Sequence, residues 1–233
     1  MSEYILECKN VTKSFGGKTA LDGVSFSLAR GRIAGLLGPN GSGKTTLIKT
    51  ICKLLVPDSG EILIDGKTPG TETKSLISYL PDRNYLSGSM STEELIGFFS
   101  DFYADFQPDT ARKMIENLEI NPQEKLKTLS KGTREKVQLI MVMSRREKLY
   151  LLDEPIGGVD PAARDYIINS IIQNYSEDAT VLISTHLITD VEKILDDVIF
   201  IRDGQILLQE SVDNLREREG KSVDAVFREV FRC

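Results

Sequence analysis

A glycine-rich segment near the start of the chain has the residue types and the spacing of a phosphate-binding loop. Residues 38–45 read GPNGSGKT and match the pattern G-x-x-x-x-G-K-[ST] in full. Glycines let backbone N–H groups close around phosphate oxygens, and the N-terminus of a following helix adds a favourable dipole. We expect Lys44 to neutralise the β- and γ-phosphates of a nucleotide and the Thr45 hydroxyl to bind Mg²⁺. The residues expected to bind nucleotide in this segment are Gly38, Pro39, Asn40, Gly41, Ser42, Gly43, Lys44, Thr45 and Thr46.

A second segment places two acids at the end of an apolar strand, because residues 149–155 read LYLLDEP. A buried strand places Asp153 at the carboxyl edge of a sheet, which is where α/β proteins bind phosphates. There Asp153 suits the Mg²⁺ shell, and Glu154 suits orienting or deprotonating an attacking water. Taken alone, the strand end reads equally well as a turn or a cap. Beside the glycine-rich segment, it predicts nucleotide hydrolysis.

Three further segments complete a resemblance to the ABC ATPases. Residues 129–133 (LSKGT) resemble the family's LSGGQ signature, residues 156–161 (IGGVDP) resemble its D-loop, and residues 184–186 (STH) resemble its switch-histidine segment. With the glycine-rich loop and the acid pair, five motifs stand in the family's order and cover nearly the whole chain.

The resemblance implies head-to-tail dimers with two ATP molecules in the interface. It implies that Ser130 and the Gly132 backbone hold the partner's γ-phosphate, which suits a helix N-terminus. It also implies that Asp160 communicates across the interface and that His186 contacts the γ-phosphate. Phe15 resembles the aromatic residue that stacks on adenine. For these residues, a helix cap, a surface position or hairpin packing is the plainer alternative.

Two departures from the family pattern concern this site. The family usually has glutamine where this chain has Asp82, which can still ligate Mg²⁺ but donates no hydrogen bond. The signature has Lys131 in place of glycine and Thr133 in place of glutamine. Lys131 adds a positive charge near the place where the partner's γ-phosphate is expected.

The apolar pattern predicts the elements that position these motifs. Apolar runs alternate with segments of helical spacing, which indicates a mainly parallel sheet covered on both faces. The runs expected to form buried strands are 32–37, 149–152, 180–184 and 197–201. The expected helices in this part are 44–55, which Pro57 ends, 161–175 and 189–195.

The predicted fold class is α/β, with a P-loop NTPase core, an N-terminal antiparallel β layer and an inserted helical subdomain. Strands at 4–9 and 20–28 flank a Gly-Gly turn and give the antiparallel layer. Residues 83–147 have little strand character and form the expected helical insert, with helices at 92–103, 108–118 and 133–146. We therefore expect a single ATPase domain over 1–233, with an α/β core at 1–82 and 148–210 and a tail at 211–233 that is mainly helical.

Composition limits the class of partner. A net charge of −6 argues against broad nucleic-acid binding, and three dispersed cysteines suggest free thiols rather than a zinc site. The first residues lack the pattern of a signal peptide, and no apolar run reaches the roughly 20 residues of a membrane span. We expect the chain to lie on the cytoplasmic face of the membrane through its partners.

The expected function is MgATP hydrolysis coupled to transport through a separate integral membrane permease. The expected partners are this permease and a second ABC ATPase subunit, in a homodimer or a heterodimer. Export is favoured because residues 222–231 resemble the terminal helix of exporter-type subunits, although a surface helix that covers its own core is the alternative. The rival function is a soluble ABC ATPase of a non-transport assembly complex.

The contact with the permease is expected on the helical insert near Asp82. Residues 85–106 are rich in apolar side chains, and those not needed for the core could form a groove for a short helix of the permease. Charge substitutions at Tyr85 or Leu86 are expected to spare ATPase activity and to abolish recruitment.

Overall fold

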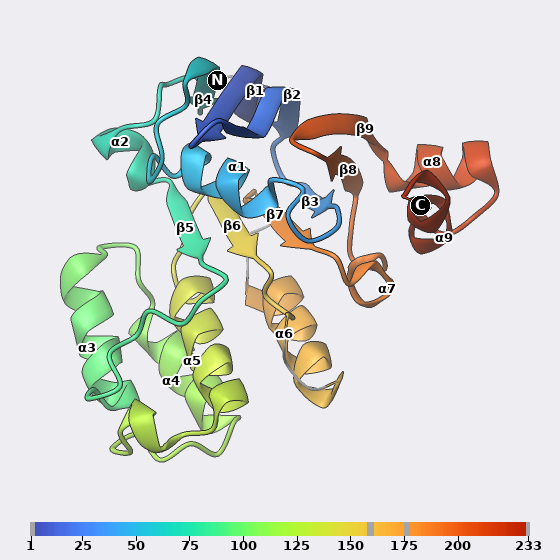
Figure 1. Cartoon of the computed structure of the whole chain (residues 1–233). Coiled ribbons are helices and arrows are strands. Elements are labelled where there is room, and N and C mark those ends of the chain that lie inside the picture. The colour runs from blue at the N-terminus through green and yellow to red at the C-terminus, as the bar shows by residue number, and fades with distance from the viewer. Residues whose placement is uncertain (1–2, 158–160, 175–177, 232–233) are drawn as a thin grey trace.

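The computed structural model describes residues 3–157, 161–174 and 178–231, and it is organised around a sheet with strand order β5-β6-β7-β3-β8-β9 (Figure 1). All neighbouring strands are parallel except the last pair. Its strands are β3 (Ile33–Leu37), β5 (Ile77–Leu80), β6 (Leu149–Asp153), β7 (Thr180–Thr185), β8 (Asp197–Arg202) and β9 (Gln205–Ser211). The strands β3, β6 and β7 are buried along their whole length, as expected for a sheet that is covered on both faces.

An antiparallel layer covers one face of this sheet, with strand order β2-β1-β4. Its strands are β1 (Tyr4–Phe15), β2 (Lys18–Ala29) and β4 (Ser59–Ile64). Helix α1 (Lys44–Ile51) lies between this layer and the sheet and shares one apolar core with both. The predicted α/β core with an N-terminal antiparallel layer is therefore confirmed.

Helix α1 ends earlier than its apolar spacing suggests. The sequence predicted a helix to Leu55, but the helix stops at Ile51. Lys53 takes a left-handed φ of 55°, and the N–H of Leu54 donates to Lys49 O over 2.8 Å. This is the Schellman arrangement, in which a left-handed residue closes the last turn. Leu54 is thereby left 56% exposed instead of continuing the buried face.

The stretch between β5 and β6 is helical and has its own apolar core. It follows a short helix, α2 (Thr71–Lys74), that the sequence did not predict. Ser91 caps α3 through its hydroxyl in a capping box with Glu94. The helical elements of this insert are α3 (Thr92–Phe102), α4 (Pro108–Glu116), the 3₁₀ turn η1 (Leu126–Thr128) and α5 (Lys131–Met143).

The opposite face of the sheet is covered by helices from the C-terminal half. They are α6 (Pro161–Asn174), α7 (Ile188–Val191), α8 (Val212–Glu219) and α9 (Val223–Val230). The helix expected at 189–195 is the four-residue α7, because the chain leaves it to bury Leu195 and to enter β8. Helices α8 and α9 make the described part of the tail mainly helical, as expected.

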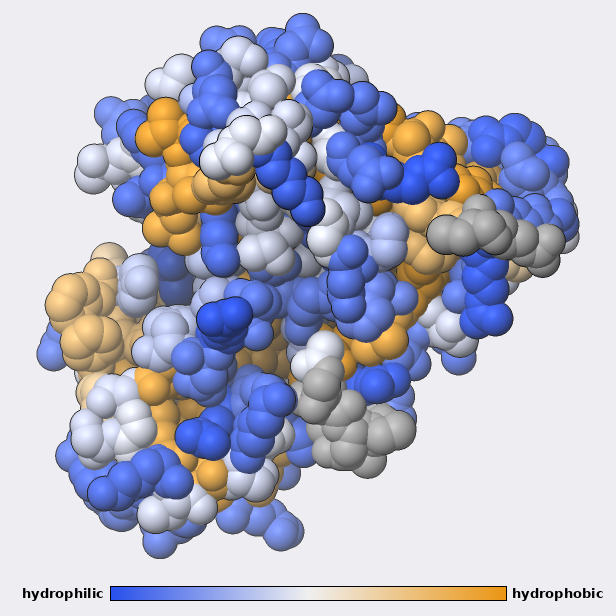
Figure 2. Space-filling view, in the orientation of Figure 1, coloured by the Kyte–Doolittle hydropathy of each residue, from blue (hydrophilic) through white to orange (hydrophobic). Residues whose placement is uncertain are grey.

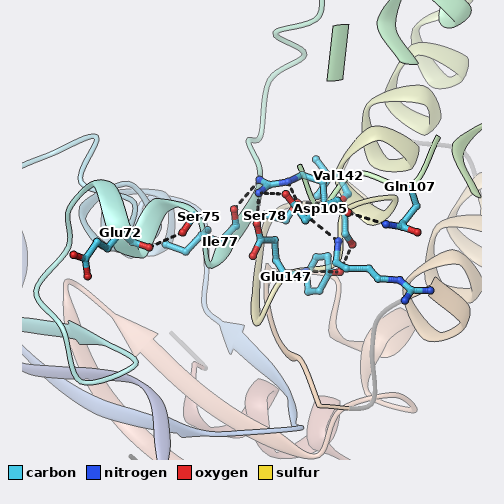
Figure 3. A network of polar contacts seen from close by, with 11 residues as sticks. Glu72, Ser75, Ile77, Ser78, Asp105, Gln107, Val142 and Glu147 are labelled. Carbon is cyan, nitrogen blue, oxygen red and sulfur yellow. Dashed lines mark hydrogen bonds and ion pairs between the residues drawn. The ribbon is translucent and has the colours of Figure 1, made fainter. Parts of the chain in front are cut away.

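Arg145 joins the helical insert to the sheet, at the point where α5 leads into β6. Figure 3 shows three of its partners, Ile77, Asp105 and Glu147. Its guanidinium donates two hydrogen bonds to Asp105, at 3.1 and 3.2 Å, and one to Ile77 O at 2.9 Å. It also pairs with Glu147 and lies 3.9 Å from the centroid of the Tyr103 ring. Only 6% of the Arg145 side chain is exposed. We call Arg145, Asp105 and Glu147 the joint cluster.

Candidate active site

The glycine-rich loop connects β3 to α1 and depends on glycine at two positions. A Cβ on Gly38 would lie 2.3 Å from Ile201 O, and Gly43 has a φ of 108° with Ala20 O only 2.7 Å from a Cβ. Neither position accepts a side chain without moving backbone. The loop therefore lies close against β8 and β2, and the N-terminus of α1 faces the open side.

Lys44 holds its ammonium group inside this loop. The side chain is 5% exposed, and Nζ donates to Gly38 O over 2.8 Å and to Pro39 O over 3.1 Å. Glu154 Oε1 lies 3.3 Å away. A cation in this place can attract the phosphate groups of a nucleotide.

Asp153 ends β6 and is completely buried. Its Oδ1 accepts hydrogen bonds from Ser184 Oγ at 2.6 Å and Thr45 Oγ1 at 3.1 Å. Its Oδ2 is buried without a hydrogen-bond partner. Burial is the main reason why the pKa of the Asp153 carboxyl is raised. A buried acceptor of this kind can receive a cation or a metal-bound water.

Glu154 follows directly and turns its side chain toward two other predicted residues. Its φ of 52° is in the left-handed region, which is unfavourable for a non-glycine residue and is frequent at functional sites. Oε1 faces Lys44, and Oε2 lies 3.0 Å from His186 Nδ1. The structure thus brings together the three residues predicted to act in hydrolysis, Lys44, Glu154 and His186. A carboxylate held by a lysine and a histidine is positioned to accept a proton from water.

Ser184 is a site residue whose role sequence reasoning missed. The register pairs Asp153 with Ser184 on β7. The Ser184 hydroxyl donates to Asp153, and both its O and Oγ accept from Glu154 N, at 3.0 and 3.2 Å. It therefore orients both acids. The signal was a hydroxyl residue two positions before the predicted histidine, at the end of a strand.

A cavity of about 480 Å³ lies over the loop. The expected residues Lys44, Thr45, Asp82 and Glu154 line it. Its other walls, which were not predicted, come from the start of β2 and from the turn between β8 and β9. The residues that the sequence did not point to are Lys18, Thr19, Ala20, Asp203 and Gly204.

Phe15 stands at the end of β1, 47% exposed, with Lys13 Nζ 5.5 Å from its ring centroid. It lies on the hairpin that supplies Lys18 and Thr19 to the cavity, but it does not line the cavity itself. The signature residues are also elsewhere. Ser130 is exposed and caps α5, where its Oγ accepts from Thr133 N over 3.1 Å. Asp160 lies outside the residues that the structure describes.

The residues present fit a magnesium ion that is carried by a nucleotide. In residues 3–157, 161–174 and 178–231 no group of three or more His, Cys, Asp or Glu side chains is arranged to hold a metal by itself. Mg²⁺ at phosphate sites uses one or two protein ligands and completes its shell with phosphate oxygens and water. The Thr45 hydroxyl and the free oxygen of Asp153 supply such ligands, and Asp82 lines the same cavity.

Comparison with known proteins agrees with this geometry. Residues 21–157 match the family model described as "ABC transporter". The ABC transporter ATP-binding protein YtrB of Bacillus subtilis is 31% identical over 91% of this chain and 74% of its own. The SkfA peptide export ATP-binding protein SkfE of the same organism is 31% identical over 92% of both chains.

The fold also agrees with solved structures. A structure described as the ATP binding subunit of an ABC transporter superposes with a TM-score of 0.86 at 27% identity, over 98% of this chain and 100% of that one. The family match covers more than half of the 233 residues and spans both the loop and the acid pair. The chain therefore belongs to the ABC transporter family, as an ATP-binding subunit that hydrolyses ATP.

Proposed function

We propose that this chain drives export through a separate integral membrane permease, from a peripheral position on the cytoplasmic face of the membrane. The relative SkfE, which matches over 92% of both chains, is named for peptide export. No helix in the described part of the chain is long and apolar enough to cross a bilayer. The single domain proposed has its α/β core at 1–82 and 148–210, its helical insert at 83–147 and its tail at 211–233.

The observation that carries the proposal is that Asp82 lines two cavities. One is the 480 Å³ cavity over the glycine-rich loop, which we call the nucleotide cavity. The other is a groove of about 680 Å³ between the end of α1, β5 and α3. Tyr85, Phe99 and Tyr103 of the insert line this groove, and Leu54 lines it from the core. A residue shared by both spaces can couple nucleotide binding to an occupant of the groove.

Exposed apolar side chains lie on α3 and just after α1, two of the elements that border the groove. Figure 2 shows hydrophobic surface at the left margin, over α3 below and near α2 above. Phe98 and Phe102 are 45% and 69% exposed on α3, with ring centroids 4.5 Å apart, and Val56 is 68% exposed in the segment after α1. Apolar surface around a concave site suits a short amphipathic helix, which here would come from the permease.

In this proposal, each site residue has one role toward ATP. Lys44 binds the β- and γ-phosphates, Glu154 accepts the proton of the attacking water, and His186 contacts the γ-phosphate. The backbone of residues 38–46 surrounds the phosphates, and Phe15 stacks on adenine. The residues that would hold Mg²⁺ are Thr45, Asp82 and Asp153, and the ion would offset phosphate charge when bound.

We also propose that two ATPase subunits, identical or different, share each nucleotide. Ser130 and Gly132 are at the N-terminus of α5, outside the cavity that holds Lys44. A helix N-terminus attracts anions, so a second subunit can complete the site with its own signature. Lys131, 74% exposed next to Ser130, adds positive charge at this place. Asp160 would contact the second subunit.

The alternative function is a soluble ABC ATPase in a non-transport assembly complex, whereas the packing of the tail bears only on the direction of transport. Phe227 and Phe231 of the tail pack on Phe200, with ring centroids 5.5 and 5.9 Å away. The tail therefore covers its own core, so its resemblance to an exporter-type terminal helix no longer supports export. The argument that remains for export is the relative SkfE, which is named for peptide export. The groove still favours transport, because an assembly role does not require it.

The test is co-purification from detergent-solubilised membranes of the native source. We expect the wild type to recover an integral membrane protein and Tyr85→Asp to lose it while keeping ATPase activity, because Tyr85 is 53% exposed and lines the groove. Leu86, in contrast, packs against the core of the insert, so its substitution would disturb folding. Leu207→Asp is the matched control, at a 40% exposed apolar residue on β9.

Recovery of an integral membrane protein with wild type and Leu207→Asp, but not with Tyr85→Asp, supports the proposal. Recovery of only soluble proteins by fully active wild type would favour the assembly complex. Equal recovery by all three forms would show that the permease contacts the chain outside the groove.

A further inference from the structure

The segment that carries His186 lies between α6 and the C-terminal helix α9. This segment spans residues 186–192 and includes α7. From one side, Arg164 on α6 pairs with Asp190 over 2.9 Å. From the other side, Asp224 N at the start of α9 donates to Glu192 Oε2 over 3.1 Å. The C-terminal end of α7 is therefore tied to helices on both sides.

Helices α7 and α9 lie side by side and bury apolar residues in the same core. Ile188 and Val191 on α7 are 2% and 1% exposed, and Val223 and Val226 on α9 are 0% and 5% exposed. All four belong to one core. Loss of packing on α9 would leave a gap beneath α7, because closely packed cores relax only partly around a removed group.

Helix α9 is itself fixed to the sheet. The Phe227 and Phe231 rings stack on one another, with centroids 4.1 Å apart, and both contact Phe200 on β8. Arg202 at the end of β8 donates to Val230 O over 3.1 Å. These contacts give α9 a defined position from which it can fix that of α7.

His186 and α9 also line one cavity of about 390 Å³, together with Arg164 and Asp190. The side chains from α9 are Asp224, Phe227 and Arg228, and Arg228 pairs with Asp224 over 2.8 Å. Glu154, which contacts His186 Nδ1 through Oε2 at 3.0 Å, does not line this cavity. The space beside the imidazole is therefore bounded by the tail, and the tail limits where the ring can move.

We propose that α9 is a positioning element for His186 and that Val226 is the main positioning residue. Helix α9, anchored on β8, holds α7 in place, and α7 fixes the imidazole at 3.0 Å from the Glu154 carboxylate. The consequence for turnover rests on the proposed role of His186 in hydrolysis. The consequence for the position of the imidazole does not.

The experiment uses the fact that His186 is the only histidine of the chain. In protein labelled at histidine and purified without a histidine tag, the imidazole gives a single set of NMR signals that reports this side chain alone. Val226→Ala removes apolar volume from the core that α7 and α9 share. Val24→Ala is the matched control, because Val24 is equally buried but lies in the antiparallel layer. Val226→Ile is the conservative variant.

We expect Val226→Ala to shift or broaden the His186 imidazole signals and to lower kcat on the order of tenfold at unchanged KM, since small displacements of catalytic groups have large effects on rate. Val24→Ala should leave the imidazole signals and kcat at wild-type values, even where it lowers Tm as much as Val226→Ala does. Val226→Ile should also keep the signals and kcat close to wild type. Imidazole signals in Val226→Ala identical to those in Val24→Ala would overturn the proposal.

His186→Ala separates the two claims. If it leaves turnover unchanged, then the proposed role of His186 is wrong, whereas a shift of the imidazole signals in Val226→Ala would still establish the link to α9.

Discussion

Two groups of polar side chains, in the nucleotide site and in the joint cluster, are built differently. In the nucleotide site, Asp153 Oδ2 and Ser42 Oγ are buried without a partner. In the joint cluster, Arg145 is bound by two carboxylates, a carbonyl and an aromatic ring. Buried polar atoms are normally satisfied, so free acceptors indicate a place for a ligand, whereas a satisfied network indicates a fixed joint. We therefore expect substitutions in the first group to affect turnover and those in the second to affect stability.

The largest effect is expected from Glu154→Gln. The amide cannot accept the proton of water, so turnover should fall about 10²–10⁴-fold while ATP binding remains. Under the shared-site proposal, size-exclusion chromatography with ATP should then show a trapped dimer. Lys44→Ala is the contrast, because it should lose ATP affinity as well as turnover. If Glu154→Gln keeps a wild-type free energy of unfolding, the nucleotide site affects turnover without affecting stability, as the comparison expects. Turnover near wild type in this variant would contradict the comparison.

In the joint cluster, Arg145→Met should lower the free energy of unfolding by about 3–5 kcal/mol, because it leaves two carboxylates without their cation. Denaturant unfolding measures this loss. Arg112→Met is the control, since Arg112 also contacts two carboxylates, Glu93 and Asp109, but is 49% exposed. Exposed pairs contribute about 1 kcal/mol or less. Equal losses in the two variants would contradict the comparison.

A pH effect should also come from the joint cluster. Burial raises the pKa of Glu147 to about 7 from an ordinary value of 4.5, with Arg145 opposing the shift. The folded state therefore binds the proton more tightly, and its contribution to stability is lost as pH rises from about 4.5 to 7. The loss should be about 1–3 kcal/mol. Glu147→Gln should remove it from a series of unfolding curves, and an unchanged pH slope would show that another group is responsible.

The smallest effect is expected at Asp82, which lies between the two regions. Asp82→Ala should lower turnover roughly tenfold, as for residues near a metal shell, with a smaller change in ATP affinity. Asp82→Gln, which introduces the family's usual residue, should keep turnover. Steady-state kinetics with ATP measures both. Wild-type kcat in Asp82→Ala, alone and with the permease, would make Asp82 a surface residue.

The sequence alone determined the phosphate loop, the acid pair and the order of the main strands and helices. These signals are local. Gly38 and Gly43 are needed because the loop backbone has no room for a side chain, and Asp153 follows an unbroken apolar strand. The family resemblance then placed His186, which the structure brings to Glu154. The fold class follows from the same alternation of buried strands and helices.

Only the tertiary structure decided which distant residues meet. Strand register brings Ser184 to Asp153 across 31 positions, and the close approach of β2 to the β8–β9 turn brings Gly204 to the nucleotide cavity. The joint cluster and the packing of α9 under α7 likewise join segments with no shared motif. Such contacts depend on register, on where helices stop and on how separate cores pack together, and none of these leaves a periodic signal in one stretch of chain.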